Sequence, residues 1–115
     1  MENDIVLFRY ADVLLMKSEA KVRNGESGDE ELAKVRSRVG AAFRPATLAT
    51  LLDERQLELA WEGWRRQDLI RFGRFTRAYD SRPQLPEEAN GYTTVFPIPG
   101  NVLKMNGRLV QNKGY

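Results

Sequence analysis

The chain has 115 residues, of which 42% are hydrophobic, and its formal net charge is only +2. This length suits one domain with a modest core, and the hydrophobic fraction argues against disorder. Without cysteine or histidine the chain has no disulfide, lacks the usual zinc, haem and iron–sulfur ligands, and holds no catalytic triad that needs either residue. We therefore expect a single domain over residues 1–115, with no metal and no cofactor.

The N-terminal residues show no signal peptide. The apolar run over residues 5–16 is interrupted by Arg9 and Asp12 and is too short to span a bilayer. Its apolar side chains surround the helix axis, which is typical of a buried helix and not of one lying on a membrane surface. The protein is then either cytoplasmic or part of a longer chain whose targeting segment lies upstream.

Two helices are predicted in the first third of the chain. The 3.6-residue periodicity indicates a helix over residues 9–24, and Gly25 supplies its C-terminal stop. A shorter helix begins at Asp29, which can act as its N-cap, runs to about Val39 and ends at Gly40. Two antiparallel helices joined by a short turn resemble one unit of a tetratricopeptide-like array.

A third helix is predicted from Thr47, its N-cap, to Phe72, with a bend at Gly63. Beyond it, prolines and glycines exclude long helices, and residues 93–96 are β-prone. The predicted fold is mainly α, with three principal helices in a tetratricopeptide-like arrangement over residues 5–79. An irregular Pro/Gly-rich tail, residues 80–115, is expected to pack on these helices.

The third helix is apolar on two faces yet rich in charge, so its charged groups need partners. Side chains three or four residues apart are neighbours on a helix. We therefore predict a structural ion network within this helix, made of Glu58, Glu62, Arg65, Arg66, Asp68 and Arg71. Glu58 and Glu62 lie one turn apart and also satisfy the simplest pattern of a catalytic carboxylate pair. The nearby arginines favour a packing role, so we expect no catalytic residue and no enzymatic activity.

Three aromatic residues are candidates for ligand binding: Trp61, Trp64 and Tyr79. Apolar faces of sugar rings bind well to exposed aromatic platforms, but the two tryptophans lie in the densest helix, which favours core packing. The arginines at 65, 66, 71, 74 and 77 can also be seen as a basic strip for nucleic acid or an anionic glycan. Matching acids in the same helix favour a salt-bridged face, and we expect no nucleic-acid binding.

Five strings follow one another along nearly the whole chain: RYADVLLMKSEAKVRNG (9–25), VRSRVG (35–40), DERQLELAWEGWRRQDLIRFG (53–73), VFPIP (95–99) and NGRLVQNKGY (106–115). In this order and at these separations they resemble the C-terminal part of the SusD/RagB family. The chain departs from the family pattern in its tail, where Gly107 and Lys113 stand at positions that are commonly proline.

The resemblance implies an outer-membrane lipoprotein on the cell surface, built mainly of helices with tetratricopeptide-like repeats. Family members bind oligo- or polysaccharides, and sometimes other nutrients, and act as a lid over a TonB-dependent transporter of the SusC type. Full-length members are several-fold longer. We therefore expect this chain to be a fragment that lacks the lipid anchor, the family's only membrane contact, and to oligomerise in isolation through its uncovered apolar face.

Two other functions remain open from the residues alone. A free-standing helical-repeat scaffold that binds a protein partner in the cytoplasm is favoured by the missing targeting segment. A small hydrolase that uses Glu58 and Glu62 is the weaker alternative.

Overall fold

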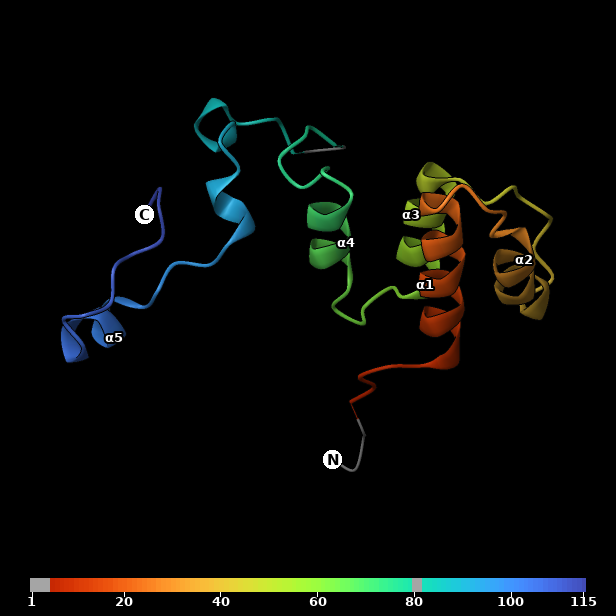
Figure 1. The fold of residues 1–115 in the computed structure, drawn as a ribbon, viewed down its shortest axis with the longest axis horizontal. Helices are drawn as coiled ribbons and strands as arrows, with labels where there is room; N and C mark the ends of the chain where they lie inside the picture. The colour runs from red at the N-terminus through yellow and green to blue at the C-terminus, as the bar shows by residue number, and fades with distance from the viewer. Residues whose placement is uncertain (1–4, 80–81) are drawn as a thin grey trace. The chain divides into compact units, whose positions relative to one another are not determined.

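The computed structural model describes residues 5–79 and 82–115, and these residues are mainly α-helical, as predicted (Figure 1). They contain no strand, and a single isolated antiparallel bridge joins Tyr79 to Arg82. None of the described helices is long and apolar enough to cross a membrane. In chain order the elements are α1 (Tyr10–Arg23), α2 (Asp29–Arg38), α3 (Leu48–Glu58), α4 (Arg65–Arg71), the 3₁₀ turns η1 (Pro86–Glu88) and η2 (Tyr92–Thr94), and α5 (Gly100–Met105).

The chain divides into two compact units, Met1–Asp68 and Leu69–Tyr115. The first unit contains α1, α2, α3 and the beginning of α4, and it holds the buried apolar core. The second unit contains the end of α4, both 3₁₀ turns and α5.

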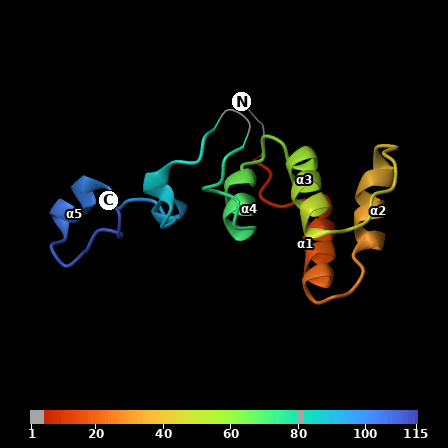
Figure 2. The same ribbon diagram turned by 90° about the horizontal axis from the view of Figure 1, so that it is seen from above.

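The predicted αα-hairpin is formed by α1 and α2, which run antiparallel (Figures 1 and 2). After α1, Gly25 has a φ of 79°, a left-handed conformation that glycine adopts without a steric penalty. The turn is tight, because the Ser18 hydroxyl donates a hydrogen bond to the Gly28 carbonyl at 2.8 Å and a Cβ atom on Gly28 would collide with Ser18. A side chain at residue 28 would therefore separate α2 from α1.

The apolar core lies where α1 packs against both α2 and α3 (Figure 2). Its five buried side chains are Leu14, Leu15, Leu32, Val35 and Leu51. Among the described residues of the whole chain, eight apolar side chains are buried, and eight polar or charged ones are buried as well. A buried charge is tolerated only when it is paired, so ion pairs must stabilise this fold alongside the core.

Helix α3 begins at Thr47, as predicted, and its capping box is completed by a residue that the sequence pattern did not favour. The backbone N–H of Thr50 donates to the Thr47 hydroxyl at 3.1 Å, and the backbone N–H of Thr47 donates to the Thr50 hydroxyl at 2.8 Å. The Thr50 side chain thus takes the place of the usual Glu or Gln.

The prediction of one helix from Thr47 to Phe72 is wrong. Helix α3 ends at Glu58 and α4 begins only at Arg65. Between them Trp61 has a φ of 67° and Gly63 has a φ of 79°. A right-handed helix cannot continue through residues in the left-handed region, so the chain turns here instead of bending gently.

A buried ion cluster joins the elements on either side of this turn to α1. Arg55 of α3 donates from Nε to both carboxylate oxygens of Asp68 in α4, at 2.9 Å each, and from one terminal nitrogen to Asp12 of α1, at 2.7 Å. These three side chains are at most 2% exposed. The planar guanidinium holds donors in a fixed fork, so one arginine can serve two carboxylates on different helices.

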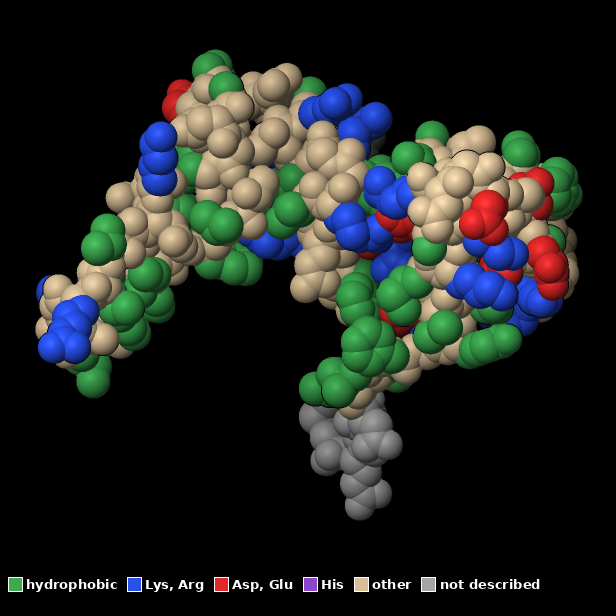
Figure 3. Space-filling view, viewed as in Figure 1, with side chains coloured by type: hydrophobic (Ala, Val, Ile, Leu, Met, Phe, Trp, Pro, Cys, Tyr) green, Lys and Arg blue, Asp and Glu red, His purple; other side chains and the backbone are tan. Residues whose placement is uncertain are grey.

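A buried carboxylate of α2 is paired with α1 across the hairpin. Glu31 of α2 is 1% exposed and contacts the ammonium groups of Lys17 and Lys21, at 2.8 and 2.7 Å. Hydrogen bonds from the two lysines lower the pKa of the Glu31 carboxyl to about 2, and the same contact raises the pKa of Lys17. Figure 3 shows the wider pattern, with basic and acidic side chains interspersed over the helices of the first unit.

The second unit is held together mainly by contacts between its loops. The Gln111 side chain accepts a hydrogen bond from the backbone N–H of Ile98 at 2.8 Å and donates one to the Ile98 carbonyl at 2.9 Å. The Tyr92 and Tyr115 rings pack edge to face with centroids 5.0 Å apart. Residues 93–96, predicted as β-prone, begin instead within the 3₁₀ turn η2.

Replacing Arg55 with methionine should lower the free energy of unfolding by about 3–5 kcal/mol, because two buried carboxylates lose their counter-charge. Chemical denaturation measures this loss. Arg44→Met is the control. Among the described residues Arg44 forms an ion pair only with the exposed Asp53, at 3.7 Å, so this substitution should change stability by less than about 1 kcal/mol. Equal effects of the two substitutions would contradict a buried cluster.

Acid should destabilise the fold partly through Glu31. Its folded-state pKa of about 2 lies below the ordinary value of 4.5, so the ionised carboxylate contributes stability above pH 4.5 and this contribution is lost as the pH falls toward 2. Glu31→Gln should remove that part of the pH dependence in denaturation curves measured between pH 2 and pH 6. Glu26→Gln, in the exposed turn after α1, is the control for the loss of one acidic side chain.

Trp61→Gly should leave the free energy of unfolding unchanged to within about 0.5 kcal/mol. Relief of the left-handed strain, about 1 kcal/mol, is offset by the greater chain entropy of glycine in the unfolded state. Truncating a buried tryptophan would instead lose about 3–5 kcal/mol, and a loss of that size in thermal or chemical denaturation would show that the ring packs on the protein.

Candidate ligand-binding pocket

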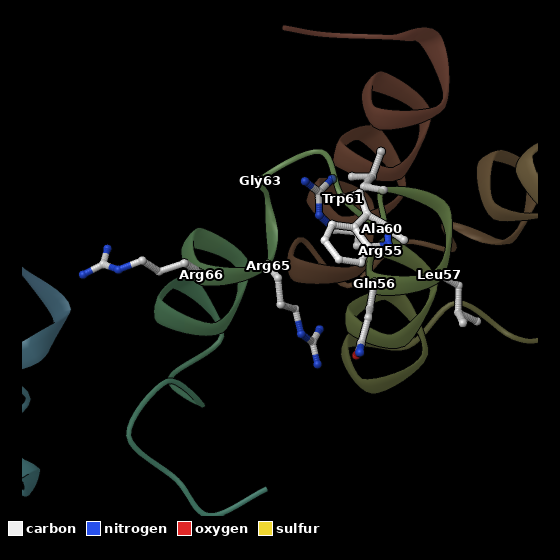
Figure 4. A pocket seen from close by; sticks show the side chains of 9 residues that line it. Arg55, Gln56, Leu57, Ala60, Trp61, Gly63, Arg65 and Arg66 are labelled. Atoms are coloured by element: carbon white, nitrogen blue, oxygen red, sulfur yellow. The ribbon is translucent and has the colours of Figure 1, made fainter. Parts of the chain in front are cut away.

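The turn between α3 and α4 borders a pocket of about 680 Å³, a volume typical of small-molecule sites. All of its lining residues belong to the first unit and come from the end of α3, the turn and the beginning of α4 (Figure 4). They are Arg55, Gln56, Leu57, Leu59, Ala60, Trp61, Gly63, Arg65 and Arg66. The break in the predicted helix therefore creates the pocket.

Trp61 is the most exposed large apolar side chain described, at 104% relative exposure. The expectation that it packs in the core is wrong, and the reason is its position at the helix break, where the left-handed backbone turns the side chain outward. A bulky residue in this region is a true conformational outlier. Such outliers concentrate at functional sites, where the surrounding structure maintains them.

Trp64 is placed differently. Its ring is partly buried and packs against Phe8 with centroids 5.5 Å apart, and the Arg55 guanidinium lies 5.8 Å from its centroid. It lines a smaller, apolar pocket of about 320 Å³ together with residues 5–8. Trp64 does not belong to the buried core, but these contacts leave less of its face available to a ligand.

Tyr79 belongs to the second unit. It is 49% exposed, and its backbone forms the isolated bridge with Arg82 through hydrogen bonds of 3.0 and 2.8 Å. Its side chain remains a candidate by exposure alone.

The polar side chains at the pocket include Gln56, Arg65 and Arg66. The sequence predicted the two arginines as members of a structural ion network and gave Gln56 no role. Gln56 was not identified as a candidate, because a single glutamine on a charged helix carries no signal. In Figure 4 its side chain and that of Arg65 extend in the same direction, whereas Arg66 points away from the other lining residues. The Arg65 guanidinium donates one hydrogen bond, to the Leu52 carbonyl at 3.0 Å.

The predicted network residues Glu58, the last residue of α3, and Glu62, in the turn after it, are both paired with an arginine from a distant part of the sequence. Arg9, which precedes α1, donates from Nε to both Glu62 oxygens at 2.9 Å and also contacts the Glu58 carboxylate. Arg38 of α2 adds hydrogen bonds of 2.9 and 3.0 Å to Glu58. Hydrogen bonds to Glu62 raise the pKa of Arg9, against the opposing effect of its desolvation.

The other predicted network residues are distributed over several environments. Asp68 pairs with Arg55, the Arg71 guanidinium lies 4.9 Å from the centroid of Phe72, and Arg65 and Arg66 border the pocket. Sequence reasoning expected partners three or four residues away, and it missed Arg9 and Asp12 because separations of 53 and 43 residues leave no local pattern.

Comparison with known proteins shows which family this chain resembles in sequence and in fold. The model of the SusD family matches residues 1–115. The starch-binding protein SusD of Bacteroides thetaiotaomicron is 33% identical over 99% of this chain. The solved structure of a laminarin-binding SusD-like protein superposes with a TM-score of 0.76 and 35% identity over 95% of the chain.

The chain spans 22% of the length of that curated relative and 23% of the chain in the solved structure. Within this shared part, the sequence resemblance, the family match and the helical fold agree. The chain belongs to the SusD family.

Proposed function

We propose that this chain is the C-terminal module of a cell-surface, SusD-like binding protein that captures glycans for uptake through a TonB-dependent, SusC-like transporter. The family match over residues 1–115 is the observation that carries the proposal. The names of the two relatives support it, because one describes starch binding and the other laminarin binding. Both named ligands are polysaccharides.

Within the module, Trp61 is the preferred sugar contact. A sugar ring stacks on an aromatic face that water can reach, and the Trp61 ring is fully exposed beside the pocket. Trp64 is the weaker candidate because Phe8 and Arg55 already pack against its ring. Tyr79 offers a half-exposed ring in the second unit.

The surroundings of Glu58 and Glu62 support binding without catalysis. A glycosidase needs one carboxylate that can donate a proton and another that can attack or activate water. Here Arg9 bridges the two carboxylates, and Arg38 also donates to Glu58. This arrangement suits a structural role that connects the segment before α1 to the end of α3.

The transporter and the lipid anchor belong to the proposal for the complete protein. Uptake of a large glycan requires a channel. The binding protein can keep the glycan near that channel only if the protein and the transporter are held in the same membrane.

A second candidate function is binding of a protein partner by a helical scaffold. One face of α1 exposes Tyr10, Val13 and Met16, at 73%, 47% and 40%. Residues spaced by three along a helix form a continuous stripe, and exposed apolar stripes are common at protein interfaces.

Native gel electrophoresis distinguishes the two functions. The complete natural polypeptide that carries this chain should be retarded in gels containing at least one polysaccharide from a panel of neutral and acidic polymers. It should release no new reducing ends from that polymer, since the proposed function is capture. A tagged copy should co-purify with a SusC-like transporter from detergent-solubilised membranes.

Absence of retardation by every polymer, together with isolation of a stoichiometric cytosolic protein complex, would favour the scaffold. Release of reducing ends that Glu58→Gln or Glu62→Gln abolishes would favour a hydrolase and contradict both binding functions.

A further inference from the structure

The pocket that Trp61 lines contains basic side chains but no acidic one. Its nine lining residues include three arginines and no acidic residue. Arg55 is neutralised from the buried side by Asp12 and Asp68. The guanidinium of Arg65, by contrast, contacts no carboxylate among the residues that the structure describes, and its one hydrogen bond goes to the neutral carbonyl of Leu52.

Arg65 therefore keeps hydrogen-bonding capacity for a ligand. A guanidinium has five N–H donors in a planar fork that matches a carboxylate or sulfate, and within the described part of the chain Arg65 uses only one of them. Gln56 extends in the same direction from the end of α3 and adds an uncharged donor and acceptor (Figure 4). The Trp61 ring supplies the apolar surface of the same pocket.

We propose that this pocket binds an acidic sugar residue of a glycan, with the sugar ring stacked on Trp61 and its anionic group paired with Arg65. This inference rests on the proposed function and specifies the chemical class of its ligand. The anionic group is either the carboxylate of a uronic acid or a sulfate ester, which have the same charge and a similar fit to a guanidinium.

Charge is the reason for preferring an acidic over a neutral sugar. A neutral sugar would satisfy the stacking surface but leave the partly buried Arg65 without a counter-charge. An acidic residue supplies both interactions at once. Its affinity should fall with added salt, as expected for a charge pair near the surface.

A nucleic acid offers the same combination of ring and anion but fits this surface less well. Single strands are bound by several aromatic platforms along a groove of cations. Here one exposed tryptophan stands beside the Arg65 guanidinium, which has no carboxylate partner within residues 5–79 and 82–115, and the net charge of the chain is only +2. The pocket is suited to a single ring.

Affinity electrophoresis of the complete natural polypeptide tests the proposal with four probes: polygalacturonate, dextran sulfate, amylose and oligothymidylate. The protein should bind polygalacturonate or dextran sulfate more tightly than amylose. Trp61→Gly and Arg65→Gln should each raise the dissociation constant for the acidic polymer about tenfold, the change expected for loss of one charge-assisted or stacking contact. Arg65→Lys, which keeps the charge, should lose less.

Phe43→Gly and Arg74→Gln are matched controls, because both residues are exposed and neither lines the pocket. They should leave binding of the acidic polymer unchanged. Circular dichroism of every variant verifies that it remains folded.

Preference for polygalacturonate would identify the ligand group as a carboxylate, and preference for dextran sulfate would identify it as a sulfate ester. Tight binding of amylose that neither Trp61→Gly nor Arg65→Gln weakens would overturn this inference while leaving the glycan-binding function intact. Tighter binding of oligothymidylate than of any polysaccharide would also overturn it. Failure to bind polygalacturonate and dextran sulfate, while another polysaccharide retards the protein, would overturn this inference alone. Failure to bind every polymer of the wider panel would overturn the proposed function itself.

Discussion

The fork of Arg55 between Asp12 and Asp68 is the interaction on which the rest of the first unit depends. It connects α1, α3 and α4 through one side chain, and it crosses the point where the helical path is interrupted. Without a continuous helix, the beginning of α4 has no backbone ladder to orient it toward α3. The hydrogen bonds from the Arg55 guanidinium to Asp68 take over this role. Because these hydrogen bonds are directional, they set how the beginning of α4 is oriented toward α3.

Other ion pairs at the edges of the small core also connect segments that are distant in the sequence. Arg36 and Arg38 on α2 contact Glu54 and Glu58 on α3, while Arg9 joins the segment before α1 to the end of α3. Each of these pairs connects two segments of the first unit and therefore fixes how they pack. A sequence with 30% charged residues and a net charge of only +2 is well suited to such an arrangement, because nearly every charge has a counter-charge available.

Residues that cap or stop helices predicted the ends of helices, because these ends depend on interactions between residues close together in the sequence. Gly25 indicated the end of α1 correctly, and Thr47 was recognised as the N-cap of α3. The prediction that Asp29 caps α2 is wrong, because Gly28 is the N-cap and the Asp29 carboxylate instead accepts a hydrogen bond from the backbone N–H of Ala46 at 2.6 Å. The break before α4 was missed because a left-handed tryptophan is rare and no sequence pattern announces it. The pocket, which depends on that break, was missed for the same reason. The charged residues were identified as a network, but their partners lie up to 53 residues away, where helical spacing predicts nothing.

The nine residues around the pocket fall within the twelve positions from 55 to 66. A site assembled from one continuous segment can change its ligand by a few neighbouring substitutions, without any adjustment of distant helices. Arg55 is the exception, because it borders the pocket and also holds the buried cluster. A substitution at position 55 would therefore alter the pocket and the buried ion cluster together, whereas the other lining positions lie outside that cluster.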